Sequence, residues 1–305
     1  MKNKLLSKNA QSSGLIYSIM IVTYILISFI VPTILSFIIN PNSTAYEIIC
    51  QCISSGVIFA VVIFAKFNGA NYSINFNKKG LIVGAPLALM LFVGVFMGFG
   101  FVNGKIADWL WSIGLNVSKP DYDFRTPWHF ISYFISLVAL PAFSEELLFR
   151  GVMIKGLNKV KPLFAIIMIS LCFALYHCSL AKFVYQFVYS AMICLLYYAT
   201  ESVLSCVIAH FANNLFTLIS MYLEWHGYNV TIDLTNIWVI IIGLVVLAGF
   251  IAIVVTMIIK KSKNAEPDTK EQKVVAKEEA RKFFVFAMFG MVLCTLTIVL
   301  SLIPM

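Results

Sequence analysis

Nine apolar stretches follow one another along this chain of 305 residues. A transmembrane helix needs about 20 predominantly apolar residues to cross roughly 30 Å of hydrocarbon. Only 12% of the residues are charged, against roughly 25% in soluble domains. The sequence therefore predicts an all-α, polytopic transmembrane helix bundle with an eight-helix core and a ninth C-terminal span. The expected spans are residues 15–39, 46–66, 81–103, 129–154, 163–181, 183–200, 203–223, 237–259 and 283–305.

Lysine and arginine residues predict the orientation, because cytoplasmic loops of membrane proteins are enriched in them. With the N-terminus in the cytoplasm, 18 of the 22 basic residues fall on the cytoplasmic side. The four expected outside are Lys105, Lys119, Arg125 and Lys182. We therefore expect a cytoplasmic N-terminus and an external C-terminus. The excess of lysine over arginine points to an AT-rich bacterial genome, hence to a bacterial cell membrane.

A charged segment divides the chain. Residues 260–282 read KKSKNAEPDTKEQKVVAKEEARK and are expected to form a cytoplasmic linker, flexible or weakly helical. Residues 1–259 are then the membrane-embedded core, and residues 283–305 a C-terminal transmembrane anchor.

The composition also indicates which classes of molecule the protein contacts. The net charge of +8 does not indicate nucleic acid, since the lysines lie between apolar spans rather than in one patch. The seven cysteines all fall within apolar stretches, which is typical of small buried hydrophobic side chains. Membrane lipids are the expected surroundings.

Ionisable side chains inside a membrane are costly, so those present call for a functional explanation. The fourth expected span carries Pro141, which should kink the helix. Residues 142–150 follow it and read AFSEELLFR, with Glu145, Glu146 and Arg150 as the ionisable side chains. Glu146 and Arg150 are four residues apart on one helix face and are predicted to form an ion pair. Glu145 points about 100° away and is left free to face the interior.

Two further spans carry histidines. Phe173 and His177 share one helix face, as do His210 and Asn214, with Asn213 beside them. Counted at about 1.5 Å per residue from the cytoplasmic ends, Glu145 and both histidines can meet near the middle of the membrane.

Such a cluster is compatible with three chemistries. Glu145 could act as general base on a water, with His177 assisting and with His210 and Asn214 donating to the oxyanion. The same glutamate and histidines could instead bind zinc, although no HExxH pattern brings them onto one helix. Buried Glu and His also occur in proton-coupled transporters. A cysteine nucleophile, Cys206 or Cys178, is less favoured because neither has a cationic setting of its own.

These three motifs, in this order, resemble those of the CPBP family of intramembrane endopeptidases, which includes type II CAAX prenyl proteases and bacterial Abi proteins. EELLFR is similar to its EExxxR motif, FALYH to FxxxH and HFANN to HxxxN. The resemblance covers about residues 128–225.

The resemblance implies a catalytic set of Glu145, His177, His210 and Asn214, supported by Glu146, Arg150 and Phe173. It implies hydrolysis of a peptide bond in a membrane-associated protein or peptide. No cofactor is assigned, and zinc on Glu145, His177 and His210 remains the alternative. A non-catalytic immunity or scaffold protein and a proton-coupled transporter are the competing functions.

Overall fold

A computed structural model describes residues 9–68, 77–115, 122–228, 232–262 and 269–302. All regular secondary structure in these residues is helical, which confirms the predicted all-α bundle. Its elements are α1 (Ala10–Ser36), α2 (Thr44–Phe67), α3 (Lys78–Ser112), α4 (Pro127–Tyr133), η1 (Phe134–Ala139), α5 (Leu140–Glu146), η2 (Leu147–Met153), α6 (Ile154–Gly156), α7 (Pro162–Tyr176), α8 (Leu180–Thr200), α9 (Val203–Trp225), α10 (Ile237–Ser262) and α11 (Lys270–Ser301).

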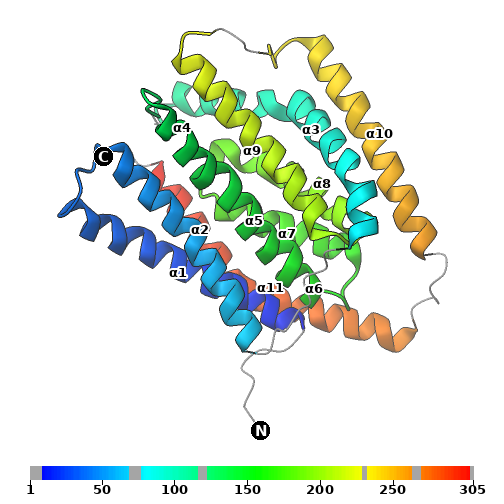
Figure 1. The fold of residues 1–305 in the computed structure, drawn as a ribbon. Helices are drawn as coiled ribbons and strands as arrows, with labels where there is room; N and C mark the ends of the chain where they lie inside the picture. Colours follow the sequence, from blue (N-terminus) through cyan, green and yellow to red (C-terminus); the bar gives the residue numbers. More distant parts are fainter. Residues whose placement is uncertain (1–8, 69–76, 116–121, 229–231, 263–268, 303–305) are drawn as a thin grey trace.

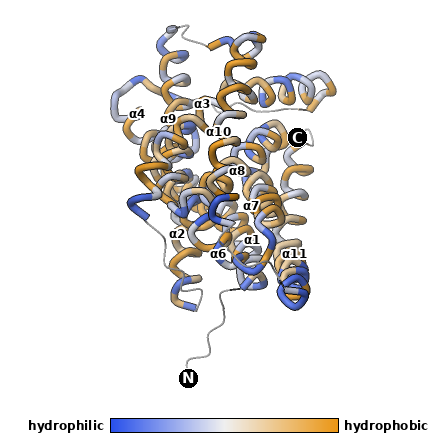
Figure 2. Tube along the Cα trace, turned by 90° about the vertical axis from the view of Figure 1, so that its right-hand side faces the viewer, coloured by the Kyte–Doolittle hydropathy of each residue, from blue (hydrophilic) through white to orange (hydrophobic). Residues whose placement is uncertain are grey.

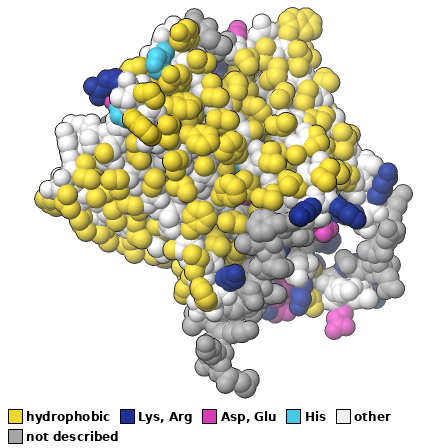
Figure 3. Space-filling view, in the orientation of Figure 1, with side chains coloured by type: hydrophobic (Ala, Val, Ile, Leu, Met, Phe, Trp, Pro, Cys, Tyr) yellow, Lys and Arg dark blue, Asp and Glu magenta, His cyan; other side chains and the backbone are white. Residues whose placement is uncertain are grey.

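Eight of the described helices are long and apolar enough to cross a membrane. Many of their large apolar side chains point away from the protein, as Phe29 and Ile82 do with exposures of 77% and 75%. Figure 3 shows hydrophobic side chains over the middle of one face, with Lys and Arg towards its edges. Such a surface suits lipid rather than water. The protein is therefore an integral membrane protein.

The helix from Pro127 to Gly156 runs through the middle of the bundle (Figure 1), with α2 on one side and α9 on the other. It combines α4, α5 and α6 with two π-helical segments, η1 and η2, which bracket α5. π-Helical turns are rare and are frequent at functional sites. They here enclose Pro141, Glu145 and Glu146, so the predicted kink takes the form of two widened turns.

The fifth predicted span is shorter than expected. Residues 163–181 were expected to cross the membrane, but α7 ends at Tyr176 and has 15 residues. At about 1.5 Å per residue it is roughly 22 Å long, less than the hydrocarbon thickness. Since α7 and α8 pack against each other as a hairpin, the turn at 177–179 brings His177 into the bundle.

Small residues allow the helices to approach closely. A Cβ atom on Gly243 of α10 would collide with the backbone nitrogen of Gly98 on α3. Close approach at small residues is a common means of helix association in membranes, because lipid provides no hydrophobic drive for it.

The last helix, α11, packs along α1 and also contacts α7. The Ser18 hydroxyl donates to the carbonyl of Phe286 at 2.5 Å and accepts from the amide of Gly290 at 3.1 Å. Residues 270–282 form the hydrophilic beginning of this same helix, visible as the blue end of α11 in Figure 2. Residues 263–268, Lys119 and the N-terminal Lys2, Lys4 and Lys8 lie outside the described residues, and the division into core, linker and anchor stays a prediction.

Candidate active site

The site begins at a proline in the central helix, Pro141. Proline has no backbone N–H, so Pro141 cannot donate to the carbonyl of Leu137 one turn earlier. The side-chain amide of Asn214 donates to this oxygen instead, with Nδ2 3.1 Å from Leu137 O. The kink in the central helix therefore holds the motif asparagine of α9 in place.

The predicted ion pair is present and fully buried. Arg150 Nη1 donates to Glu146 Oε1 at 2.9 Å, and neither side chain is exposed. Arg150 Nη2 donates to the hydroxyl of Ser190 at 2.6 Å and to its carbonyl at 3.0 Å, which ties the pair to α8. Phe173 lies against the guanidinium, with its ring centre 5.1 Å from Cζ. The two supporting charges thus fasten three helices together.

The histidine of α9 lies between the two glutamates. His210 Nδ1 is 2.9 Å from Glu146 Oε1, so Glu146 binds both Arg150 and His210. On the other edge of the ring, His210 Nε2 is 3.9 Å from Glu145 Oε2. That separation is too long for a direct hydrogen bond. Glu145 Oε2 is buried and has no hydrogen-bond partner among the described residues.

The histidine of α7 is held separately. His177 Nδ1 is 2.9 Å from the carbonyl of Phe173. Because a carbonyl oxygen can only accept, Nδ1 carries the proton and Nε2 is an acceptor in the neutral ring. The ring also packs against Phe173 at a centroid distance of 4.8 Å. The described contacts of His177 do not include Glu145, so the expected pairing of these two is not a direct bond.

All four expected catalytic side chains line one cavity of about 330 Å³. Glu145, His177, His210 and Asn214 come from α5, the end of α7 and α9. The remaining lining residues are Phe96, Gly100, Asn103, Tyr122, Leu137, Pro141, Lys182, Tyr185, Gln186, Asn213, Thr217, Leu218, Met221 and Leu234. The structure thus brings the three motifs to a common space.

The zinc alternative fits these residues poorly. No three His, Cys, Asp or Glu side chains of the described chain are arranged to hold a metal ion. We derive no step through a metal.

No cysteine is among the described residues that line this cavity. Cys172, Cys194, Cys206 and Cys294 are buried, and the other three are half-buried. Cys206 Sγ lies 3.5 Å from the carbonyl of Ser202 within its own helix. This is the behaviour of a buried structural thiol.

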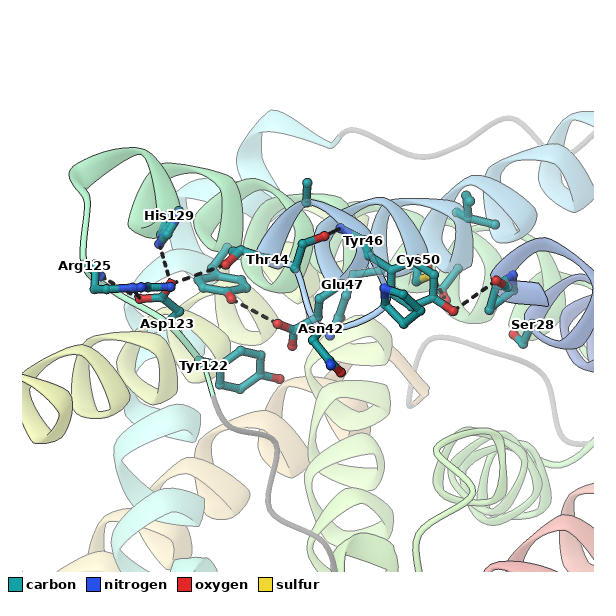
Figure 4. A pocket seen from close by; sticks show the side chains of 18 of the residues that line it. Ser28, Asn42, Thr44, Tyr46, Glu47, Cys50, Tyr122, Asp123, Arg125 and His129 are labelled. Carbon is teal, nitrogen blue, oxygen red and sulfur yellow. Dashed lines mark hydrogen bonds and ion pairs between the residues drawn. The ribbon is translucent and has the colours of Figure 1, made fainter. Parts of the chain in front are cut away.

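A larger cavity, of about 1170 Å³, lies at the end of the bundle where α1 meets α2 (Figure 4). Asp123 is its main polar junction, bound by Arg125 at 2.6 Å and approached by Thr44 and His129 at 3.5 Å each. The hydrogen bonds from Arg125 hold the pKa of this loop carboxyl well below its usual range. None of the motif residues lines this cavity, although Tyr122 lines both.

The smaller cavity is also lined by polar side chains of α8 that were not expected from the sequence to belong to the site. Lys182 was expected in an external loop, but it belongs to the first turn of α8 and lines the cavity, as do Tyr185 and Gln186. The available signal was their spacing of three and four residues within an apolar stretch, directly after the FxxxH motif.

The comparisons agree with the motifs. Residues 127–216 match the family model "Type II CAAX prenyl endopeptidase Rce1-like", which confirms the resemblance inferred from the sequence. No curated protein and no solved structure matches the chain. The matched range contains all three motifs. It supports an intramembrane endopeptidase of CAAX type in general terms.

Proposed function

Because residues 127–216 match the Rce1-like model of type II CAAX prenyl endopeptidases, we propose that Glu145 activates a water molecule for peptide-bond hydrolysis within the membrane. One observation carries this proposal: Glu145 Oε2, buried and unpartnered among the described residues, faces His210 Nε2 across 3.9 Å. Two hydrogen bonds of about 2.8 Å meeting at one oxygen can span this separation. A water there would contact both side chains.

The reaction begins with proton transfer. Glu145 takes a proton from the water, whose oxygen attacks the carbonyl carbon of the peptide bond. His177 lines the same cavity and has Nε2 available as an acceptor, so it can hold the second hydrogen of the water. The carboxyl group of Glu145 then passes its proton to the leaving amine as the C–N bond breaks. The products are a new carboxyl terminus and a new amino terminus.

The developing oxyanion needs donors. Asn214 uses one of its two N–H groups on Leu137, which leaves the other for the oxyanion. In the doubly protonated form of His210, Nδ1–H is held by Glu146 and Nε2–H is the second donor. Preorganised donors of this kind are among the largest contributions to catalysis of acyl transfer.

The substrate class follows from the location. Because the site lies in a bundle with an apolar exterior, the substrate is a protein or peptide that is itself associated with the membrane. The orientation with a cytoplasmic N-terminus and the bacterial cell membrane belong to this proposal and rest on the distribution of the basic residues.

The decisive experiment uses purified protein in proteoliposomes with a panel of internally quenched peptides, lipidated and unlipidated. Mass spectrometry identifies new peptide termini. We expect cleavage by the unaltered protein and a loss of at least about 100-fold in the Glu145→Gln variant, since general bases contribute 10²–10⁴.

The matched control is Glu47→Gln, which makes the same substitution in the larger cavity. It should retain cleavage. Equal cleavage by Glu145→Gln and the unaltered protein would contradict the proposal and favour a scaffold role. Solute flux into vesicles that Glu145→Gln abolishes, without any new termini, would favour a transporter.

A further inference from the structure

Lys182 places a positive charge on the wall of the catalytic cavity. It is the sole lysine or arginine among the described residues that line this cavity. Its side chain is exposed and lies within 4.0 Å of no carboxylate of the described chain. A cation within an apolar bundle is costly unless it meets an opposite charge or serves a purpose.

Other hydrogen-bonding groups lie around it. Tyr185 and Gln186 follow Lys182 by three and four residues on α8 and line the same cavity, so the three share one helix face. Asn103 of α3 also lines this cavity. Its Oδ1 is buried and has no hydrogen-bond partner among the described residues. Buried polar atoms of this kind are normally satisfied, so this oxygen has the capacity to accept a hydrogen bond from a bound molecule.

The charged side chains of the cavity therefore suit a peptide that carries a negative charge. Glu145 supplies the negative group that acts on water, and Lys182 supplies the positive group that an anion would neutralise. An extended peptide has N–H groups for Asn103, and its anion can be a terminal carboxylate or an acidic side chain. A hydrogen bond between charged partners contributes more than one between neutral groups.

We propose that Lys182 and Gln186 form an anion-binding subsite that holds a carboxylate of the peptide substrate next to the catalytic glutamate, while Asn103 Oδ1 accepts a backbone N–H of the same peptide. This inference rests on the proposed peptidase function and adds the charge class of its substrate. The subsite selects peptides that carry a carboxylate near the bond that is cut.

The experiment compares peptides that differ in one charge. The cut in an internally quenched reporter is first mapped with the unaltered protein in proteoliposomes. Two series are then made, with a carboxylate at one to five residues from the cut. One series ends in a free carboxyl group and is compared with its C-terminal amide. The other is amidated and carries Glu, compared with Gln.

We expect the unaltered protein to cleave one series about tenfold better in kcat/KM in its charged form, as a charge-assisted hydrogen bond predicts. The difference should lie mainly in KM. Lys182→Gln should lower kcat/KM for the charged peptide about tenfold, to near that for the uncharged one, and Lys182→Arg should retain much of the preference. A preference in the first series identifies the terminal carboxylate, and one in the second identifies an acidic side chain.

Lys105→Gln is the matched control, since it removes the same charge from an exposed lysine outside the cavity. It should retain the preference. Equal cleavage of charged and uncharged peptides by the unaltered protein would overturn the subsite. So would a Lys182→Gln variant that loses activity equally on both, because Lys182 would then act on the catalytic groups. In both cases the Glu145-dependent cleavage would remain, so the peptidase function would stand. Absence of all cleavage would overturn both.

Discussion

The side-chain amide of Asn214 donates a hydrogen bond to the backbone carbonyl of Leu137, with 3.1 Å between Nδ2 and O. This carbonyl would bond to the N–H of residue 141 in a regular α-helix, but that residue is proline. A backbone feature of one motif-bearing helix thus determines the orientation of a motif side chain on another.

Replacing Pro141 with alanine tests this relationship. The new backbone N–H would compete with Asn214 for the Leu137 carbonyl and release the amide from its position. We expect kcat to fall by about tenfold or more, since small displacements of catalytic groups cost up to about 100-fold, with KM within a factor of two. The matched control is Pro86→Ala in α3, which also restores a helical donor but away from the cavity. Equal kcat in the unaltered protein and Pro141→Ala would contradict the role of the proline.

Two hydrogen bonds in series hold the side-chain oxygen of Asn214. The Tyr185 hydroxyl donates to Asn213 Oδ1 at 2.6 Å, and Asn213 Nδ2 donates to Asn214 Oδ1 at 3.2 Å. We expect Tyr185→Phe to lower kcat roughly fivefold with little change in KM, because a net hydrogen bond is worth about 1 kcal/mol. Tyr197→Phe, on the same helix and outside the cavity, is the control. A change in melting temperature alone, without loss of kcat, would show that Tyr185 serves only stability.

Variants of the buried pair Glu146 and Arg150 should affect stability and activity differently. Arg150→Gln leaves a buried carboxylate without its strongest partner, which typically costs about 3–5 kcal/mol. The double variant Glu146→Gln and Arg150→Gln removes both charges and should recover part of the melting temperature in detergent. It should remain inactive, because Glu146 also holds His210. A double variant no more stable than Arg150→Gln would contradict a compensating pair.

The contact of α3 with α10 predicts opposite effects for two glycines. Gly243→Ala should lower the melting temperature, because its Cβ would meet the backbone of Gly98. Gly104→Ala, also within a helix, has no atom within 4 Å of the new Cβ. It should be neutral or more stable by about 0.5–1 kcal/mol, since alanine is the better helix former. Thermal unfolding in the same detergent compares the two, and equal shifts would contradict the packing.

Local spacing predicted much of the site. The four-residue interval between Glu146 and Arg150 is a property of one helix, so their ion pair followed from the sequence and is confirmed. The order of the three motifs on successive helices likewise predicted a common location, and Glu145, His177, His210 and Asn214 line one cavity.

Contacts between helices could not be predicted in the same way. The bonds of His210 to Glu146 and of Asn214 to Leu137 join residues 64 and 77 positions apart. The end of α7 was missed because most residues after His177 are apolar, so the hydropathy pattern continues across the turn. Residues 270–282 were expected to be flexible or weakly helical, yet Thr269 and Gln272 form a capping box that begins α11.

The central claim is that Glu145 acts on water rather than on the peptide itself. A single turnover of the proteoliposome enzyme in ¹⁸O-labelled water, with enzyme in excess of peptide, tests it most directly. We expect the new carboxyl terminus of the product to carry one ¹⁸O atom after this single turnover. An unlabelled product, with ¹⁸O appearing in the Glu145 side chain instead, would show attack by the carboxylate and would contradict the account.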